Sequence, residues 1–395
     1  MTVALREHAD RYTIERAVPS HASFAWHAYT VVAAAACVMI GVYWDISWHM
    51  SIGRDTFWTP AHLLIQAGGL GAGGSSAYVA LRTTFRGTDE QRANSVGFWG
   101  FRAPLGAWVC IWGCLAMLTS APFDNWWHDA YGLDVRIISP PHVVLALGIV
   151  SITLGALLLT LARQNQSTGR DQVRFAWCFS IAAGLWLMNV AVMLSEYSYK
   201  ELMHSGLYFR VTATYYPLVL LTTARASKRR WPATTAAGIY MGLVLGLMWL
   251  LQLFPAEPKL GPIYQRVTHM VTMDFPAFLV VPALALDLTR GRLDGRVRDL
   301  LLAPILGLVF LATFIAIEWP FASFMITEHS RNWFFNGDNY VYFMSNEAVR
   351  RTYRFADWGR WAAPLAPQLA IAAVMATLSS YLGLKWGAWM TRVKR

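Results

Sequence analysis

Long apolar stretches recur along the whole chain and constrain its fold more than any other feature. Each has about 20 predominantly apolar residues, enough to cross the roughly 30 Å hydrocarbon core of a bilayer. Only 14% of the residues are charged, against about 25% in soluble proteins. We expect ten spans, at residues 25–44, 60–82, 103–121, 139–162, 175–197, 206–224, 233–254, 270–288, 300–322 and 362–384. These spans predict an all-α fold, a polytopic integral membrane helical bundle.

The basic residues follow the alternation of the spans. The formal net charge is +10, and most arginines and lysines fall before, after or between alternate spans, in segments 6–16, 82–102, 163–174, 225–230, 290–298 and 385–395. Such an asymmetry follows the positive-inside rule. It predicts that both termini are cytoplasmic in a multi-pass protein of the cell (inner) membrane. It also accounts for the positive charge without a nucleic-acid partner.

Two segments between spans combine acidic residues with histidine at the same spacing. They read YWDISWHMSIGRDTFWTPAH (residues 43–62) and FDNWWHDAYGLDVRIISPPH (residues 123–142), with the patterns Asp-x3-His-x12-His and Asp-x3-His-x13-His. The first triplet is Asp45, His49 and His62, and the second triplet is Asp124, His128 and His142. Under the predicted topology both triplets lie toward the periplasmic or extracellular side.

The residue types of the triplets indicate metal binding. An Asp and a His four positions apart project from one helical face, and the turn that follows returns the chain so that the last His can approach the same point. Imidazole suits copper, zinc, iron and nickel, and two imidazoles with one carboxylate leave coordination positions open. Asp55 and Asp134 are interpreted as residues that orient ligands or fix the loop, rather than as ligands.

The triplets resemble the two metal sites in the C subunit of the copper membrane monooxygenases, the particulate methane, ammonia and short-chain hydrocarbon monooxygenases. The family's first site has the same Asp-x3-His-x12-His spacing within SWH, RDT and TP-x-H, which this chain carries at residues 47–49, 54–56 and 59–62. The family's second site is Asn-x3-His-x13-His. Here Asp124 stands in place of that Asn and adds a negative charge.

The C-terminal half resembles the A subunit of the same family. The segments that carry the resemblance are KRRWPATTA (228–236), FPAFLVVPALALDL (275–288), WPFASFMITE (319–328) and NYVYFMSNEAVRRTYRF (339–355). The resemblance therefore implies a C-like part, 1–204, fused to an A-like part, 205–395. A glutamate of the A subunit lies near the first metal site in the family, and Glu328 is the candidate for it. Glu318, His269 and Asp274 are further polar groups near spans and match no motif.

The resemblance implies an oxidoreductase, a copper-dependent monooxygenase that uses O2 to hydroxylate methane, a short-chain hydrocarbon or ammonia. The implied metal ligands are the two triplets and Glu328, with Asp124, His128 and His142 as the catalytic candidates. The implied partners are a B-like subunit with cupredoxin domains, two further copies of the protomer in a trimer, a quinol or other electron donor, and membrane lipid.

Three alternatives remain open at the level of sequence. The same two-His-one-carboxylate set occurs in non-haem iron oxygenases, and zinc would also accept these ligands. An outward-facing metal transporter or metallochaperone-like membrane protein would use the triplets as loading sites. A b-type cytochrome would need further histidines at matching depth, which this sequence lacks.

Overall fold

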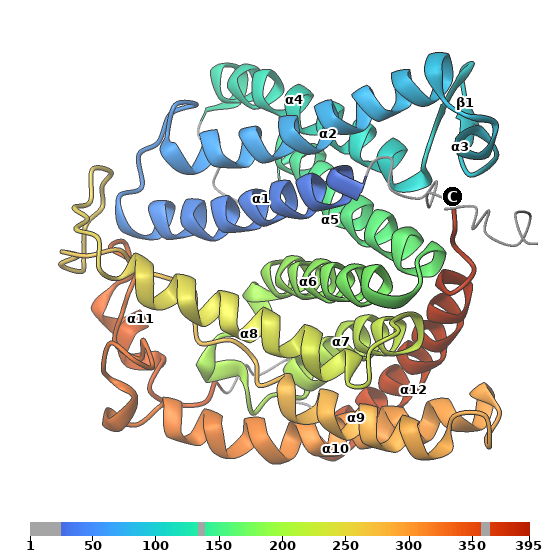
Figure 1. Ribbon diagram of the computed structural model, residues 1–395. Coiled ribbons are helices and arrows are strands. Elements are labelled where there is room, and N and C mark those ends of the chain that lie inside the picture. The colour runs from blue at the N-terminus through green and yellow to red at the C-terminus, as the bar shows by residue number, and fades with distance from the viewer. Residues whose placement is uncertain (1–24, 133–138, 357–363) are drawn as a thin grey trace, which may run out of the picture.

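The protein is described by a computed structural model, and the described residues are 25–132, 139–356 and 364–395. They form a helical bundle with one small β-hairpin (Figure 1), which confirms the all-α class. The helices are α1 (Ala25–Ser51), α2 (Pro60–Arg86), α3 (Asp89–Ala93), α4 (Leu105–Tyr131), α5 (Pro140–Gln166), α6 (Gly169–Met193), α7 (Gly206–Ala226), α8 (Pro232–Leu251), α9 (Val280–Leu293), α10 (Asp299–Met325), α11 (Asn346–Arg351) and α12 (Leu365–Met390). The hairpin pairs β1 (Val96–Phe98) with β2 (Phe101–Ala103), and short 3-10 turns cover Ser195–Tyr197, Lys200–Leu202 and Glu328–Ser330.

Within the described part of the chain, seven helices are long and apolar enough to cross a membrane: α1, α4, α5, α6, α8, α10 and α12. The expected number of ten spans is not confirmed. Helices α2 and α7 have 27 and 21 residues but are not among the seven.

The expected span at 270–288 is wrong as a continuous helix. Residues 270–278 form no helix or strand, and α9 starts only at Val280 and has 14 residues, or about 21 Å at 1.5 Å per residue. Pro276 lacks the N–H that a helix needs and disfavours a helical conformation at Phe275. The backbone N–H of Val271 instead donates to Ser51, and that of Phe278 donates to Glu318.

Prolines and glycines set the ends of the two hairpins that carry the triplets. Pro60 and Pro140 occupy the first turns of α2 and α5, where their missing N–H costs nothing. Gly53 and Gly132 follow α1 and α4 with φ of 82° and 84°, a conformation that glycine adopts without strain. The local chain path therefore repeats together with the Asp/His spacing.

Small residues let the helices of these hairpins approach closely. An added Cβ at Gly106 or Gly113 of α4 would lie 2.7 Å from the Gly155 carbonyl oxygen or 2.9 Å from that of Gly148, both on α5. Such close helix contacts through small residues are common in membranes, where van der Waals packing drives helix association. The main core runs through both halves of the chain, and the boundary expected at 204/205 falls in the short connection before α7.

The connections rich in arginine lie at one end of the bundle. The α3–β1–β2 segment, the α5–α6 and α9–α10 connections and the chain end after α12 lie toward the right in Figure 1, where α1 also begins. The α1–α2 connection and α11 lie at the opposite end (Figure 1). Residues 1–24 are outside the described range, and the cytoplasmic location of the termini stays a prediction.

Candidate metal centre

Four side chains converge where α1 ends and α2 begins. They are Asp45 and His49 on α1, Asp55 in the connection, and His62 in the first turn of α2, and we call them the four-residue cluster. One ligand atom from each lies within 4.8 Å of all the others. The Asp-x3-His-x12-His pattern therefore corresponds to side chains that lie close together in the structure.

The contacts within the four-residue cluster are between imidazole nitrogens and carboxylate oxygens. His62 Nε2 lies 3.0 Å from Asp45 Oδ1 and 3.3 Å from Asp55 Oδ2. His49 Nε2 lies 3.9 Å from Asp45 Oδ2 and 3.5 Å from Asp55 Oδ2. Four ligands tetrahedrally arranged at about 2.0–2.1 Å from a metal are about 3.3 Å apart. The observed separations bracket that value.

Neighbouring groups orient the cluster. The Nδ1–H of His62 donates to the Thr56 carbonyl oxygen at 2.9 Å, which leaves Nε2 as the nitrogen that faces the carboxylates. A carbonyl acceptor behind the imidazole is the usual arrangement at metal-binding histidines. The indole Nε1–H of Trp48 donates to the Arg54 carbonyl oxygen at 3.0 Å and so fixes the chain immediately before Asp55.

A buried oxygen of Asp45 supports a cation at this position. Asp45 Oδ1 is buried, and His62 Nε2 lies 3.0 Å from it, close enough to donate a hydrogen bond when the imidazole is protonated. A neutral His62, whose proton is on Nδ1, would leave this buried oxygen without a donor, and that costs free energy. A cation between the four donors would remove that cost, and the residues present therefore fit a metal ion.

The second triplet assembles in the same way at the end of α4 and the start of α5. The Asp124 Oδ1 atom lies 3.5 Å from His128 Nε2 and 3.7 Å from His142 Nε2, and it too is buried without a hydrogen bond. The Nδ1–H of His128 donates to the Gly132 carbonyl oxygen at 3.1 Å, and His142 Nδ1 lies 3.0 Å from Ser139 Oγ. Both Nε2 atoms are thus directed toward Asp124.

The two sites differ in the number of ligands that the structure brings together. Within residues 25–132, 139–356 and 364–395, the four-residue cluster is the group of His, Cys, Asp or Glu ligand atoms that meets the 4.8 Å separation. The second triplet has three members among the described residues. Its possible fourth member, Asp134, and the nearby Arg136 lie outside the described residues.

Asp55 lies within the four-residue cluster. We interpreted it as a residue that orients ligands or fixes the loop, and the structure places its carboxylate among the four possible ligand groups. Neither the periodicity of a helix nor the repeated triplet predicts this position, because Asp55 reaches the cluster only through the turn at Gly53. In the sequence, only the RDT segment at residues 54–56, which the chain shares with the first metal site of the resembled family, pointed to Asp55.

The other sequence candidates are not members of the four-residue cluster. Glu328 is exposed in the 3-10 turn after α10, and His269 is exposed in the segment between α8 and α9. Neither belongs to the four-residue cluster. Glu318 is fully buried in α10, where its Oε1 accepts from the Phe278 N–H at 2.7 Å and its Oε2 has no hydrogen-bond partner.

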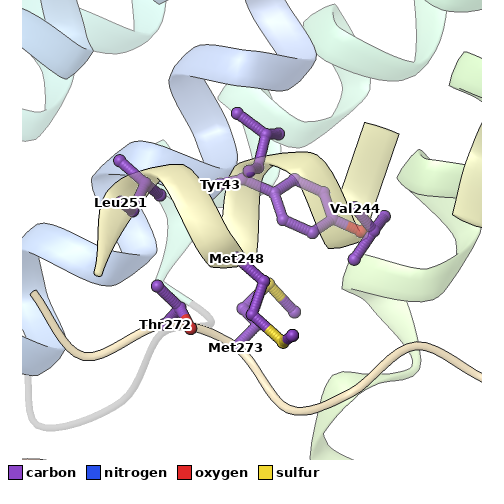
Figure 2. Close-up of a pocket in the computed structure, with 7 residues that line it drawn as sticks. Tyr43, Val244, Met248, Leu251, Thr272 and Met273 are labelled. Carbon is purple, nitrogen blue, oxygen red and sulfur yellow. The ribbon is translucent and has the colours of Figure 1, made fainter. Parts of the chain in front are cut away.

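A small cavity lies on the other side of α1 from the cluster. Figure 2 shows Tyr43, Met248, Thr272 and Met273 around it, and its volume is about 10 Å³, enough for one water molecule. Tyr43 precedes Asp45 by two residues, which is about 200° around a helix. The cavity is therefore separated from the cluster by α1 itself.

Comparisons of this chain with protein-family models, with curated proteins and with solved structures found no match. The resemblance to copper membrane monooxygenases therefore depends on the motifs and their spacing.

Proposed function

We propose that this chain is the membrane-embedded component of a copper-dependent monooxygenase that uses O2 to hydroxylate a small substrate, methane, a short-chain hydrocarbon or ammonia. The observation that carries the proposal is the convergence of two Asp/His/His triplets at equivalent turns of two hairpins, each with a buried carboxylate oxygen that faces imidazole Nε2 atoms. Seven apolar helices support a location in the membrane.

The ligand sets suggest different roles for the two sites. Four protein ligands fill the coordination shell of a small ion, as in structural sites, whereas three leave a position for substrate or water. The four-residue cluster would hold its metal in a closed shell. Asp124, His128 and His142 would hold the second metal and are, by the resemblance, the catalytic candidates. Copper bound there would supply the redox chemistry that activates O2.

The residues around the second triplet have positioning roles in this proposal. The Gly132 carbonyl oxygen holds the His128 ring, and the Ser139 hydroxyl holds that of His142. Asp124 contributes a negative charge that stabilises a cation at the shared Nε2 position. Trp126, Trp127 and Tyr131 pack edge to face around this end of α4, where they can limit the access of water.

The assembly that we propose follows the resemblance. A C-like part, 1–204, and an A-like part, 205–395, would be fused in one chain, with the metal sites toward the periplasmic side of the cell membrane. The activity would also need electrons from a quinol or other donor, a B-like subunit with cupredoxin domains, and assembly as a homotrimer.

One observation favours an alternative metal. The four-residue cluster has two carboxylates, and oxygen donors favour harder cations than soft sulfur donors do. Iron, as in a non-haem oxygenase, or zinc therefore fits this cluster, as does a transport or metallochaperone-like role for it. Metal identification separates these possibilities from copper catalysis.

Metal analysis and EPR of the purified chain test the proposal. We expect copper in the wild type and a loss of one copper in each of His49→Ala and His128→Ala. The exposed His269 lies outside both sites, and His269→Ala should keep the full metal content. Oxygen uptake with a quinol should fall with His128→Ala. Unchanged metal in both triplet variants would refute the proposal, and iron or zinc in place of copper would select the alternatives.

A further inference from the structure

An exposed aromatic cluster surrounds the β-hairpin between α2 and α4. It comprises Phe85, Phe98, Trp99, Phe101 and Trp112, which we call the hairpin aromatic cluster, and all five side chains are exposed, Trp99 by 79%. Trp99 packs against Phe98 and Trp112, with ring centroids 4.7 and 5.8 Å apart. The cluster is distinct from both candidate metal sites, which lie beside the α1–α2 and α4–α5 connections.

The hairpin is held in place by hydrogen bonds to both neighbouring helices. The Trp108 indole N–H on α4 donates to the Val96 carbonyl oxygen at 3.0 Å, and the Arg102 backbone N–H donates to Thr84 Oγ1 on α2 at 2.8 Å. A turn with positive φ at Trp99 and Gly100 closes the hairpin. The aromatic tip therefore has a fixed position against α4.

That position places the tip at the level of a membrane span. Phe98 and Trp99 both contact Trp112, with centroids 5.8 Å apart in each case. Trp112 lies seven residues after the first residue of α4, which corresponds to about 10 Å along the helix. Because α4 is one of the seven apolar helices, the rings lie beside the span rather than beyond its end. Exposed tryptophan at this depth is typical of the membrane interface.

Arginines surround the base of the hairpin. Arg86 at the end of α2 and Arg102 on β2 are exposed, and the side chain of Arg102 donates to the Arg92 carbonyl oxygen at 3.2 Å. Basic residues next to a span are attracted to anionic lipid headgroups. The aromatic rings at the tip of the hairpin thus suit the acyl chains of a lipid leaflet, and the arginines at the other end of the hairpin suit its anionic headgroups.

We infer that the hairpin is an anchor for anionic phospholipid. The rings of the hairpin aromatic cluster insert at the boundary of the acyl chains, while Arg86 and Arg102 bind the phosphate of the headgroup. This inference is independent of the metal sites and of the proposed oxygenase activity, so either can fail without the other.

Spin labelling tests the depth of the tip. In the full chain with its four cysteines replaced by alanine, single labels are placed at Trp99→Cys, at Leu118→Cys on the exposed face of α4, and at Asp89→Cys on α3. In vesicles of phosphatidylcholine and phosphatidylglycerol, we expect the label at position 99 to be relaxed more by O2 than by a water-soluble nickel chelate, like the label at 118. The label at 89 should show the reverse.

Two outcomes of this experiment would overturn the inference. A label at position 99 that behaves like the one at 89 lies in water. A label shielded from both reagents, with spin–spin broadening, is covered by a second copy of the chain.

Lipid titration tests the headgroup contact. Phosphatidylglycerol added to the detergent-solubilised chain should bind more weakly to the Arg86→Gln/Arg102→Gln variant, by about 5-fold per arginine. The matched control is Arg296→Gln/Arg298→Gln, which removes two exposed arginines from the α9–α10 connection at the same end of the bundle. An equal loss in both variants, or equal binding of phosphatidylcholine, would show that the hairpin is not a specific site.

Discussion

Replacing Asp55 by Asn tests how much this carboxylate contributes to metal binding at the four-residue cluster. The four distances between imidazole nitrogens and carboxylate oxygens in the cluster run from 3.0 to 3.9 Å. Their mean of about 3.4 Å, divided by the tetrahedral ratio of edge to radius, gives a radius of about 2.1 Å, which is a metal–ligand bond length. We therefore predict that Asp55 is a ligand of a metal ion bound at the four-residue cluster.

The expected loss of affinity follows from this distance. Two unit charges about 2 Å apart interact by about 8 kcal/mol at an effective dielectric constant of 20, and desolvation offsets much of this. A retained net of about 3 kcal/mol corresponds to about a 100-fold loss of metal affinity in Asp55→Asn. A residue that only orients a ligand typically costs about 10- to 100-fold.

Competition with a chelator of known affinity measures this loss. The second site is first disabled by His128→Ala, so that only the four-residue cluster is titrated. Asp129→Asn serves as the control, since Asp129 is an exposed acid near the second triplet that accepts from Asn125. A loss in Asp55→Asn of less than 10-fold would refute its assignment as a ligand.

Three further predictions concern positions outside the ligands. Gly53→Ala should weaken metal binding at the four-residue cluster, because φ is 82° and an added Cβ would lie 2.1 Å from the Tyr342 hydroxyl. The control is Gly100→Ala, where φ is also 82° but no atom lies near the added Cβ. Equal metal affinities of the two variants in a chelator titration would contradict this prediction. Glu318→Leu should lower the free energy of unfolding by about 1–3 kcal/mol, since it leaves the Phe278 N–H without its acceptor. Glu318→Gln keeps an acceptor oxygen and should lose less. Equal unfolding temperatures of the two variants would contradict this prediction. Burial lowers the pKa of Lys200, so the folded chain releases this proton at lower pH than the unfolded chain. Stability should therefore rise with pH between that lowered pKa and about 10.4. Lys200→Met should abolish the corresponding rise in the unfolding temperature. An equal rise in the variant would show that Lys200 does not cause it.

The sequence predicts the helical class and the two triplets because each depends on local periodicity. Asp45 and His49 are four residues apart on a helix, and this spacing alone places them on one face. The return of His62 follows from a short connection between antiparallel helices. The same reasoning holds for Asp124, His128 and His142.

The features that the sequence does not predict depend on contacts between distant segments. Residues 270–278 are mostly apolar and were expected within a span, but the backbone N–H groups of Val271 and Phe278 donate to Ser51 and Glu318 instead of to a helical turn. Hydropathy cannot detect such contacts. Asp55 likewise reaches the cluster through a glycine turn packed against Tyr342, a residue almost 300 positions later in the chain.

Anomalous diffraction at the copper absorption edge, from crystals of the purified chain, tests most directly whether the two Asp/His sites hold metal. We predict one peak between Asp45, His49, Asp55 and His62, and a second beside Asp124, His128 and His142. The absence of both peaks from copper-loaded crystals, with the six triplet side chains well ordered, would contradict the account.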